Sequence, residues 1–237
     1  MNYEYSYHGI FGEFEAYEAI RREREEGRNS NAEIAEKLGS YRQADFSGWR
    51  DNNKIQEQYL KEYAKEKDIW FSKVDIVKNS AVDADGKVRK FKTGAEAEVY
   101  LNKDLKTVTK IVNYSKHNKT PLDFIDNRIL LFNFLFPGTS YTITSFTLTE
   151  YGFSFVVEQP LIEGKLLEEL TSFIEKDSSQ FGRIREFMKD RFDMDSISLF
   201  DYSKGDVTVG DLHLRNVIEG IDGNLYVIDA NTSVKPH

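Results

Sequence analysis

The sequence GDLHLRNVI at residues 210–218 and the sequence YVID at residues 226–229 decide the fold that we expect for this chain. They place Asp211 five residues before Asn216, and Asp229 at the end of an apolar run. Phosphoryl transfer from ATP needs a carboxylate that accepts or orients a hydroxyl proton, and an amide and a carboxylate that hold Mg²⁺. Oxygen donors are also what this hard cation prefers. We therefore predict that Asp211 is the catalytic base and that Asn216 and Asp229 are the metal ligands.

The composition excludes several functional classes. The chain has 237 residues, 40% of them hydrophobic, which suffices for one or two domains with buried cores. It contains no cysteine, which excludes disulfides, thiolate metal sites and cysteine nucleophiles. His213 has no Cys or His partner at useful spacing, so zinc is not indicated, and we expect this residue to support its loop by hydrogen bonding.

Charge and hydrophobic runs bear on partners and location. The net charge of -8 disfavours a general nucleic-acid binder, because affinity for phosphate backbones comes mainly from Lys and Arg. Residues 1–20 lack the basic and apolar regions of a signal peptide. The most apolar run, residues 129–136, is too short to span a bilayer. We therefore expect a soluble cytoplasmic protein with no membrane partner.

The hydrophobic periodicity changes along the chain. Residues 12 to about 68 predict helices, among them one over 32–38 and one over 55–68. From residue 86 short β-type runs alternate with helices, which predicts an α+β fold rather than a doubly wound sheet. We expect an N-terminal helical region over residues 1–75 and a second domain over residues 76–237. The expected order in that domain is strands at 88–92, 97–101 and 107–112, a helix at 122–136, strands at 141–148 and 152–158, helices at 165–175 and 178–192, and short strands from residue 207 onward.

Two segments upstream of the Asp-Asn motif fit a nucleotide site. Gly94 and Ala95 lie in a turn of small residues between two predicted strands, where backbone N–H groups can approach phosphates. Lys110 lies in the strand over 107–112, and a lysine among apolar residues needs an anionic partner such as the α- and β-phosphates. Taken singly, an ordinary hairpin and a water-facing lysine explain these two segments better, and turn chemistry also explains Asp211 and Asn216. The order of the whole set along the chain favours the nucleotide site.

The carboxylate that orients Lys110 is predicted among four acidic residues. Asp123 and Asp126 lie in the helix over 122–136, where the helix dipole also favours an acid in the first turn. Glu96 and Glu98 lie next to the turn of small residues and are the alternatives.

The strand over 152–158 runs into a connection marked by Pro160 and Gly164. An adenine pocket needs an edge of this kind, with apolar walls and free backbone N–H and C=O groups. We predict that Glu158 and Leu161 lie at this edge and that the N–H of Leu161 donates to the base. A plain interdomain loop is the alternative.

At these residues the chain resembles the protein-kinase-like superfamily. The loop GDLHLRN is similar to that of aminoglycoside phosphotransferases and small atypical kinases, VIDAN stands where kinases have DFG, and GAEAEVY resembles the reduced glycine loop of atypical bacterial and phage kinases. The resemblance covers about residues 86–233 and is similar overall to the Ser/Thr/Tyr kinase domains of phage and mobile-element polyvalent proteins.

This resemblance implies a kinase-like fold. An antiparallel-sheet N-lobe over about 76–160 would precede a short C-lobe over about 161–237, with ATP between them. It further implies that Lys110 holds the phosphates, that Asn216 and Asp229 hold Mg²⁺, and that Asp211 orients the acceptor hydroxyl of a protein or a small molecule.

The chain also departs from the kinase pattern. It continues for only eight residues after Asp229, with Ala230 and Asn231 in place of a DFG-like ending and no activation segment or APE-like motif. A truncated chain, a minimal kinase or an inactive ATP binder would each explain this, and the N-terminal helices could complete the missing lobe.

Two other functions compete with an active phosphotransferase. One is a kinase-fold module that binds nucleotide and regulates with little turnover. The other is DNA binding, because residues 31–39 resemble the first helix of a helix-turn-helix. Residues 1–76 carry twelve Lys and Arg against sixteen Asp and Glu and contain no basic recognition helix, so a packing helix explains the segment better.

Overall fold

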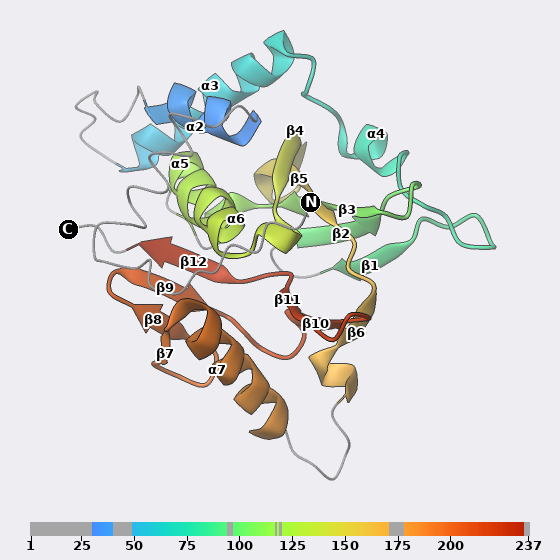
Figure 1. Ribbon diagram of the computed structural model, residues 1–237. Helices are drawn as coiled ribbons and strands as arrows, with labels where there is room; N and C mark the ends of the chain where they lie inside the picture. The colour runs from blue at the N-terminus through green and yellow to red at the C-terminus, as the bar shows by residue number, and fades with distance from the viewer. Residues whose placement is uncertain are drawn as a thin grey trace, which may run out of the picture.

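The centre of the molecule is a five-stranded antiparallel sheet with the order β1-β2-β3-β5-β4 (Figure 1). The computed structural model describes residues 30–39, 49–93, 97–116, 118, 120–170 and 178–234. The α+β fold class is confirmed, and β2 and β3 have the predicted bounds. The strands are β1 (Lys90–Thr93), β2 (Ala97–Leu101), β3 (Thr107–Val112), β4 (Thr142–Thr149) and β5 (Gly152–Pro160).

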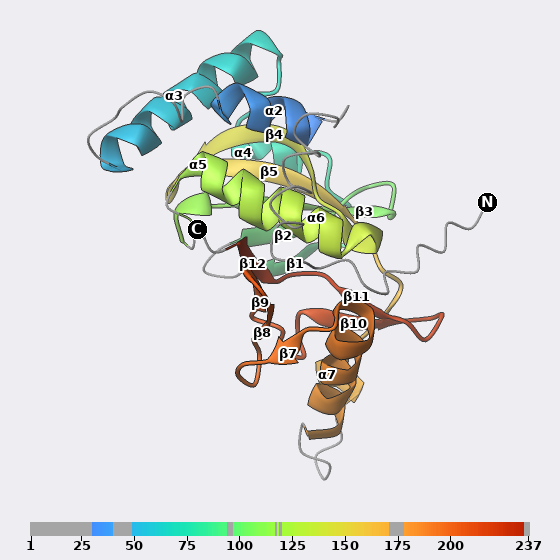
Figure 2. The same cartoon turned by 60° about the vertical axis from the view of Figure 1, so that its left-hand side comes forward.

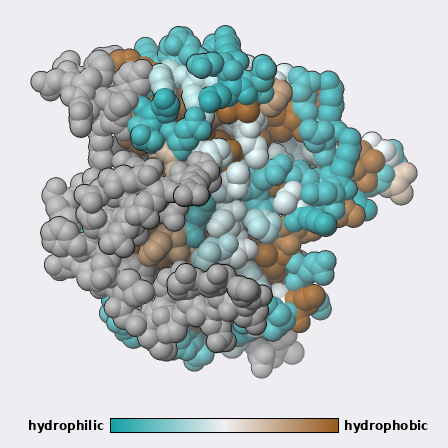
Figure 3. All heavy atoms as spheres, turned by 45° about the horizontal axis from the view of Figure 1, so that its top comes forward, coloured by the Kyte–Doolittle hydropathy of each residue, from teal (hydrophilic) through white to brown (hydrophobic). Residues whose placement is uncertain are grey.

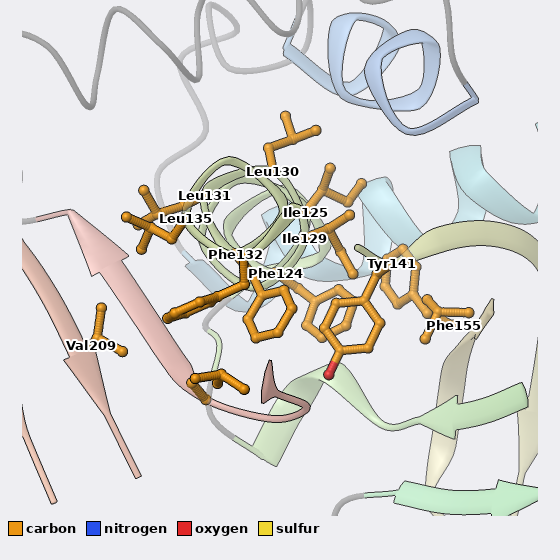
Figure 4. Packing of buried hydrophobic residues seen from close by; sticks show 14 of the residues in the cluster. Phe124, Ile125, Ile129, Leu130, Leu131, Phe132, Leu135, Tyr141, Phe155 and Val209 are labelled. Atoms are coloured by element: carbon orange, nitrogen blue, oxygen red, sulfur yellow. The ribbon is translucent and has the colours of Figure 1, made fainter. Parts of the chain in front are cut away.

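One helix between β3 and β4 packs against this sheet. It consists of α5 (Pro121–Asp123), the π-helical segment η3 (Phe124–Leu131) and α6 (Phe132–Leu135), and we call it the 121–135 helix. Thr120 caps it by accepting a hydrogen bond from the Asp123 N–H, and Pro121 supplies the first turn. Figure 4 shows Phe124 and Ile129 pointing toward Tyr141 and Phe155, with Leu131 and Leu135 on the side that faces Val209. The helix was predicted from the sequence, but its π-helical centre was not.

Two N-terminal helices, α2 (Ser30–Gly39) and α3 (Trp49–Glu66), cover the 121–135 helix and β4. The side-chain amide of Asn31 donates to the Tyr141 carbonyl (2.8 Å) and accepts from the Ile143 N–H (2.7 Å). Gln56 on α3 accepts from the N–H of Leu122 at 2.9 Å. The expectation that these helices complete the second lobe is therefore wrong, because their buried faces belong to the first. Residues 12–29 and 40–48 of the predicted helical region lie outside the described residues.

The outer face of these helices is polar. On the side of the molecule where α2 and α3 lie, the described residues are mostly hydrophilic (Figure 3). The short helix α4 (Lys73–Val77) follows α3, and its first turn is capped by the Ser72 side chain. No helix among the described residues is both long and apolar enough to cross a membrane.

The second lobe combines one long helix with two small sheets below the first lobe (Figure 2). The predicted helix over 178–192 is α7, but the predicted helix over 165–175 is wrong at its start, where a strand and a 3-10 turn are found. Residues 171–175 lie outside the described residues. The elements are β6 (Gly164–Leu166), η5 (Leu167–Leu170), α7 (Ser178–Phe192), β7 (Asp195–Ser196), β8 (Tyr202–Lys204), β9 (Val207–Gly210), β10 (Val217–Gly220), β11 (Leu225–Val227) and β12 (Asn231–Val234), in sheets of order β11-β10-β6 and β12-β9-β8-β7.

A single hydrophobic cluster connects the two lobes. It contains Ile34 and Leu60 from the N-terminal helices, Phe155 from β5, and Val209 and Val227 from the second lobe. The core therefore continues across the boundary predicted at residue 75.

Candidate active site

The loop after β9 holds Asp211 in a left-handed backbone conformation, with φ of 62°. Aspartate tolerates this region better than most residues. The Asp211 N–H donates to Asp201 Oδ1 (3.2 Å), and the Leu212 N–H donates to the Phe200 carbonyl (3.0 Å). A Cβ at Gly210 would lie 2.7 Å from Asp201 Oδ1, so a larger residue there would displace the Asp201 carboxylate. The loop before β8 thus fixes the backbone position of Asp211.

Asn216 is buried and bonds to the same aspartate. Its Nδ2 donates to the Asp211 carbonyl (2.9 Å) and to Asp211 Oδ2 (3.2 Å). His213 closes the loop between them, because its N–H donates to the Asp211 carbonyl and its own carbonyl accepts from the Asn216 N–H, both at 2.9 Å. The structure thus brings Asp211 and Asn216 into direct contact.

The backbone of Ile228 joins this loop to the first lobe. Its N–H donates to the Asn216 carbonyl at 2.9 Å. Its carbonyl accepts from Lys110 Nζ (2.8 Å) and from Tyr141 Oη (2.9 Å). Asp229 is the next residue. The backbone of Ile228 therefore connects the loop of Asp211 and Asn216, the candidate metal ligand Asp229 and the side chain of Lys110.

Lys110 lies on β3 and is buried, with 7% of its surface exposed. Its Nζ lies 3.1 Å from Tyr141 Oη and 5.0 Å from the centroid of the same ring, which combines a hydrogen bond with a cation–π contact. Burial raises the pKa of Tyr141 well above its usual value, and the negative charge of Asp229 raises it further, so the hydroxyl stays protonated. No feature of the sequence pointed to Tyr141.

Glu98 does not orient Lys110, which corrects one of the predicted alternatives. Val99, not Glu98, pairs with Lys110, so Glu98 lies on the opposite face of the sheet. There it binds Lys73 and Lys90, the latter at 2.8 Å. Burial by itself would raise the pKa of Glu98, but hydrogen bonds from both lysines and from Tyr100 outweigh burial and lower the pKa to about 2.

The structure gives a different outcome for each of the other three predicted partners of Lys110. Asp123 accepts a hydrogen bond from Asn127 Nδ2 (2.7 Å) near the start of its helix. Pairing of Lys110 with Asp126 stays a prediction. Glu96 lies outside the described residues, as do Gly94 and Ala95 of the predicted phosphate-binding turn.

Arg128 reaches the site from the 121–135 helix. Its Nη2 lies 3.1 Å from Asp229 Oδ1, and its Nη1 donates to the Ala230 carbonyl (2.5 Å) and to the side-chain oxygen of Asn231. The sequence analysis missed this residue, although it is the one basic residue in the apolar run over 122–136. A cation within an apolar helix requires buried acceptors, and that was the available signal.

Lys110, Arg128 and Asp229 line one small cavity, together with Tyr141 and apolar side chains of the sheet and the helix. Its volume of about 30 Å³ has room for roughly two water molecules. Two cations and one carboxylate leave the lining with a net positive charge, which attracts an anion such as a phosphate. A larger cavity of about 500 Å³ lies between residues 136–139, α7 and β11, and its described lining contains none of the candidate residues.

The predicted adenine edge is only partly available. The Leu161 N–H donates to the Lys106 carbonyl at 2.8 Å, so the structure contradicts its assignment as the free donor to the base. The Glu158 side chain accepts from Asn102 Nδ2 (3.2 Å), and its pairing with Thr109 places it on the face opposite to Lys110. Both residues were assigned to an edge with free backbone groups, whereas the chain here still bonds to the β2–β3 turn.

A small apolar cluster lies beside this connection on the same sheet face as Lys110. Val99 pairs with Lys110, and Leu101 pairs with Val108, so alternation places all three apolar side chains on that face. Leu161 and Ala81 pack against them. Leu101, Val108 and Ala81 are buried in this cluster, so it is part of the core rather than an open surface for a planar base.

Asn216 and Asp229 fit a magnesium ion by their chemistry. Both offer oxygen atoms, and the Asn216 amide nitrogen is already engaged with Asp211, which leaves its Oδ1 for a ligand. Within the described ranges no group of three His, Cys, Asp or Glu residues could hold a metal by itself. Magnesium is commonly held by one or two protein ligands, with phosphate oxygens and water completing the shell.

Comparison with known families finds a match. Residues 53–236 match the family described as serine/threonine/tyrosine kinase found in polyvalent proteins. A search of curated proteins finds no match. The matched range includes the five-stranded sheet, the 121–135 helix and the loop that carries Asp211, and it agrees with the family that the GDLHLRN and VIDAN motifs indicated.

Proposed function

Because this chain belongs to the family of serine/threonine/tyrosine kinases found in polyvalent proteins, we propose that it transfers the γ-phosphoryl group of ATP, with Mg²⁺, to a protein hydroxyl. Family membership makes it a kinase-type phosphotransferase. The nucleotide, the metal and the acceptor are the proposed parts.

One observation carries the proposal: the backbone of Ile228, the residue before Asp229, connects the Asp211–Asn216 loop to Lys110. A carboxylate, an amide, a second carboxylate and a buried cation are thereby held within one hydrogen-bonded unit. Phosphoryl transfer depends mainly on positioning and on charge stabilisation, and this unit supplies groups for both.

Each residue has a distinct role in the transfer. Asp211 orients the acceptor hydroxyl and takes its proton as the hydroxyl oxygen bonds to the γ-phosphorus and the bond to the β–γ bridging oxygen breaks, which leaves ADP. Asn216 holds the Asp211 carboxylate through Oδ2. Lys110 compensates negative charge on the phosphates. Asn216 and Asp229 would hold Mg²⁺, which when bound neutralises phosphate charge.

The acceptor class is supported by the family description, which names serine, threonine and tyrosine. The size of the small cavity beside Lys110 bears on how the nucleotide binds. Its volume of about 30 Å³ is far below that of a nucleotide site, so this cavity by itself does not hold a whole ATP molecule.

Transfer of ³²P from γ-labelled ATP to a mixture of dephosphorylated proteins, with thermal shift to follow ATP binding, tests the proposal. We expect labelling by the wild type, retained ATP binding but a loss of labelling of about 10³-fold or more in Asp211→Asn, and no change in Asp85→Asn, a control acid in an exposed turn.

The outcomes separate the candidate functions. Nucleotide binding without any transfer would favour the regulatory module, and labelling of a small-molecule hydroxyl alone would change the acceptor class. No thermal shift with ATP in either the presence or the absence of Mg²⁺ would overturn the proposal.

A further inference from the structure

Arg128 connects the 121–135 helix to three consecutive residues of the active site. Its guanidinium contacts the Asp229 carboxylate, the Ala230 carbonyl and the Asn231 side chain. A planar fork with five N–H donors can bind several acceptors at once, which a lysine ammonium cannot do with the same geometry. The contact therefore defines both the position and the orientation of Asp229.

The burial of the pair is uneven. The side chain of Arg128 is 12% exposed, whereas that of Asp229 is 38% exposed. The guanidinium is thus fixed inside the protein, whereas the carboxylate of Asp229 is partly exposed to solvent. A carboxylate that is held by a buried cation and is still partly exposed to solvent can also bind a further cation.

The residue before Arg128 reinforces the contact. The Asn127 carbonyl accepts from the Thr232 hydroxyl, and Asn127 Oδ1 accepts from the Val234 N–H at 3.1 Å. Two adjacent helix residues thus hold residues 229–234 against the helix. Both lie in the π-helical segment, and such segments are frequent at functional sites.

Charge determines what this contact does to a bound cation. Arg128 partly neutralises Asp229, which lowers the attraction of that carboxylate for a second cation. Without Arg128 the carboxylate would attract a divalent ion more strongly but would be held less firmly.

We propose that Arg128 is a positioning residue that fixes Asp229 for the reaction and shares the Asp229 carboxylate with the divalent cation. This inference rests on the proposed function, which assigns Asp229 as a metal ligand.

Titration with Mn²⁺, followed by the electron paramagnetic resonance signal of the free ion, tests the inference with and without a non-hydrolysable ATP analogue. Arg128→Gln should bind Mn²⁺ about five- to tenfold more tightly, a factor that reflects loss of a partly exposed ion pair. Phosphoryl transfer should fall at the same time, because Asp229 is no longer held.

Two variants serve as controls. Asn231→Ala removes a different contact of the same guanidinium and should leave Mn²⁺ affinity unchanged. In Arg128→Gln/Asp229→Asn the gain in affinity should disappear. Should Arg128→Gln not fold, Arg128→Lys keeps the charge without the fork, and it should keep wild-type Mn²⁺ affinity while transfer slows.

Equal Mn²⁺ affinity in Arg128→Gln and Asn231→Ala, or a gain that persists without the Asp229 carboxylate, would overturn the inference. A wild type that binds Mn²⁺ as expected but transfers no phosphoryl group would instead count against the proposed function alone.

Discussion

Replacing Tyr141 by phenylalanine tests whether the Ile228 peptide unit connects the two lobes. The substitution removes a hydroxyl that accepts from Lys110 (3.1 Å) and donates to the Ile228 carbonyl (2.9 Å). It keeps the ring, and with it the contact to Phe132, whose centroid is 4.7 Å away, and the cation–π contact with Lys110.

The expected cost follows from these contacts. The Ile228 carbonyl keeps Lys110 as a donor, so the main loss is an acceptor for a buried ammonium. A hydrogen bond to a charged group contributes about 1.5–3 kcal/mol, and the retained partners place the cost at about 2 kcal/mol. Binding of ATP should weaken as well, because the Lys110 ammonium is less firmly placed.

Urea unfolding measures the first effect and a nucleotide titration the second. The unfolding midpoint should fall with an unchanged m value, which indicates a change in stability rather than in the denatured state. Tyr151→Phe, at a tyrosine that is 63% exposed, is the matched control and should change neither quantity. A loss below about 0.5 kcal/mol in Tyr141→Phe would show that the hydroxyl does not join the lobes.

Two further predictions concern the first lobe and the connection. Because the pKa of Glu98 falls from an ordinary 4.5 to about 2 in the folded protein, its pairing stabilises the fold fully above about pH 5 and is lost as the pH falls toward 2. The wild type should be more stable than Glu98→Gln by about 2 kcal/mol above pH 5, once screening at the partly exposed lysines is allowed for. Acid unfolding should show that this difference in stability disappears as the pH falls toward 2. A difference that does not depend on pH would contradict the prediction. At Gly164 a Cβ would lie 2.1 Å from the Glu219 carbonyl oxygen, so Gly164→Ala should cost about 1–3 kcal/mol, whereas Gly182→Ala, with open space around it in α7, should gain about 0.5–1 kcal/mol. Equal thermal stability of these two variants would show that β6 and β10 are not closely paired.

The sequence predicted the elements whose signals are local. The β-type runs at residues 97–101 and 107–112, the proline and apolar run of the 121–135 helix, and the helical pattern of 178–192 all predicted elements close to the observed bounds. The Asp211–Asn216 contact also lies within reach of a local argument, because five residues separate the two side chains and the turn chemistry of both is known.

Other predictions required distances that no local pattern contains. Glu98 was one of four alternatives for the carboxylate that orients Lys110, but strand register sets the two residues on opposite faces of the sheet. The Leu161 N–H was expected to be free, yet it bonds to Lys106 on the turn after β2. The start of the predicted helix over 165–175 became β6 because pairing with β10 outweighs helix propensity over three residues.

The residue types and their order determined the chemistry: a base, an amide, a second carboxylate and an upstream lysine, in a chain that alternates strands and helices. Tertiary structure determined which of them meet. Arg128 contacts Asp229 across 101 residues of sequence, and Lys110 contacts Ile228 across 118. Such contacts depend on how the 121–135 helix packs between the sheet and β12, which is a consequence of the shared core rather than of any local preference.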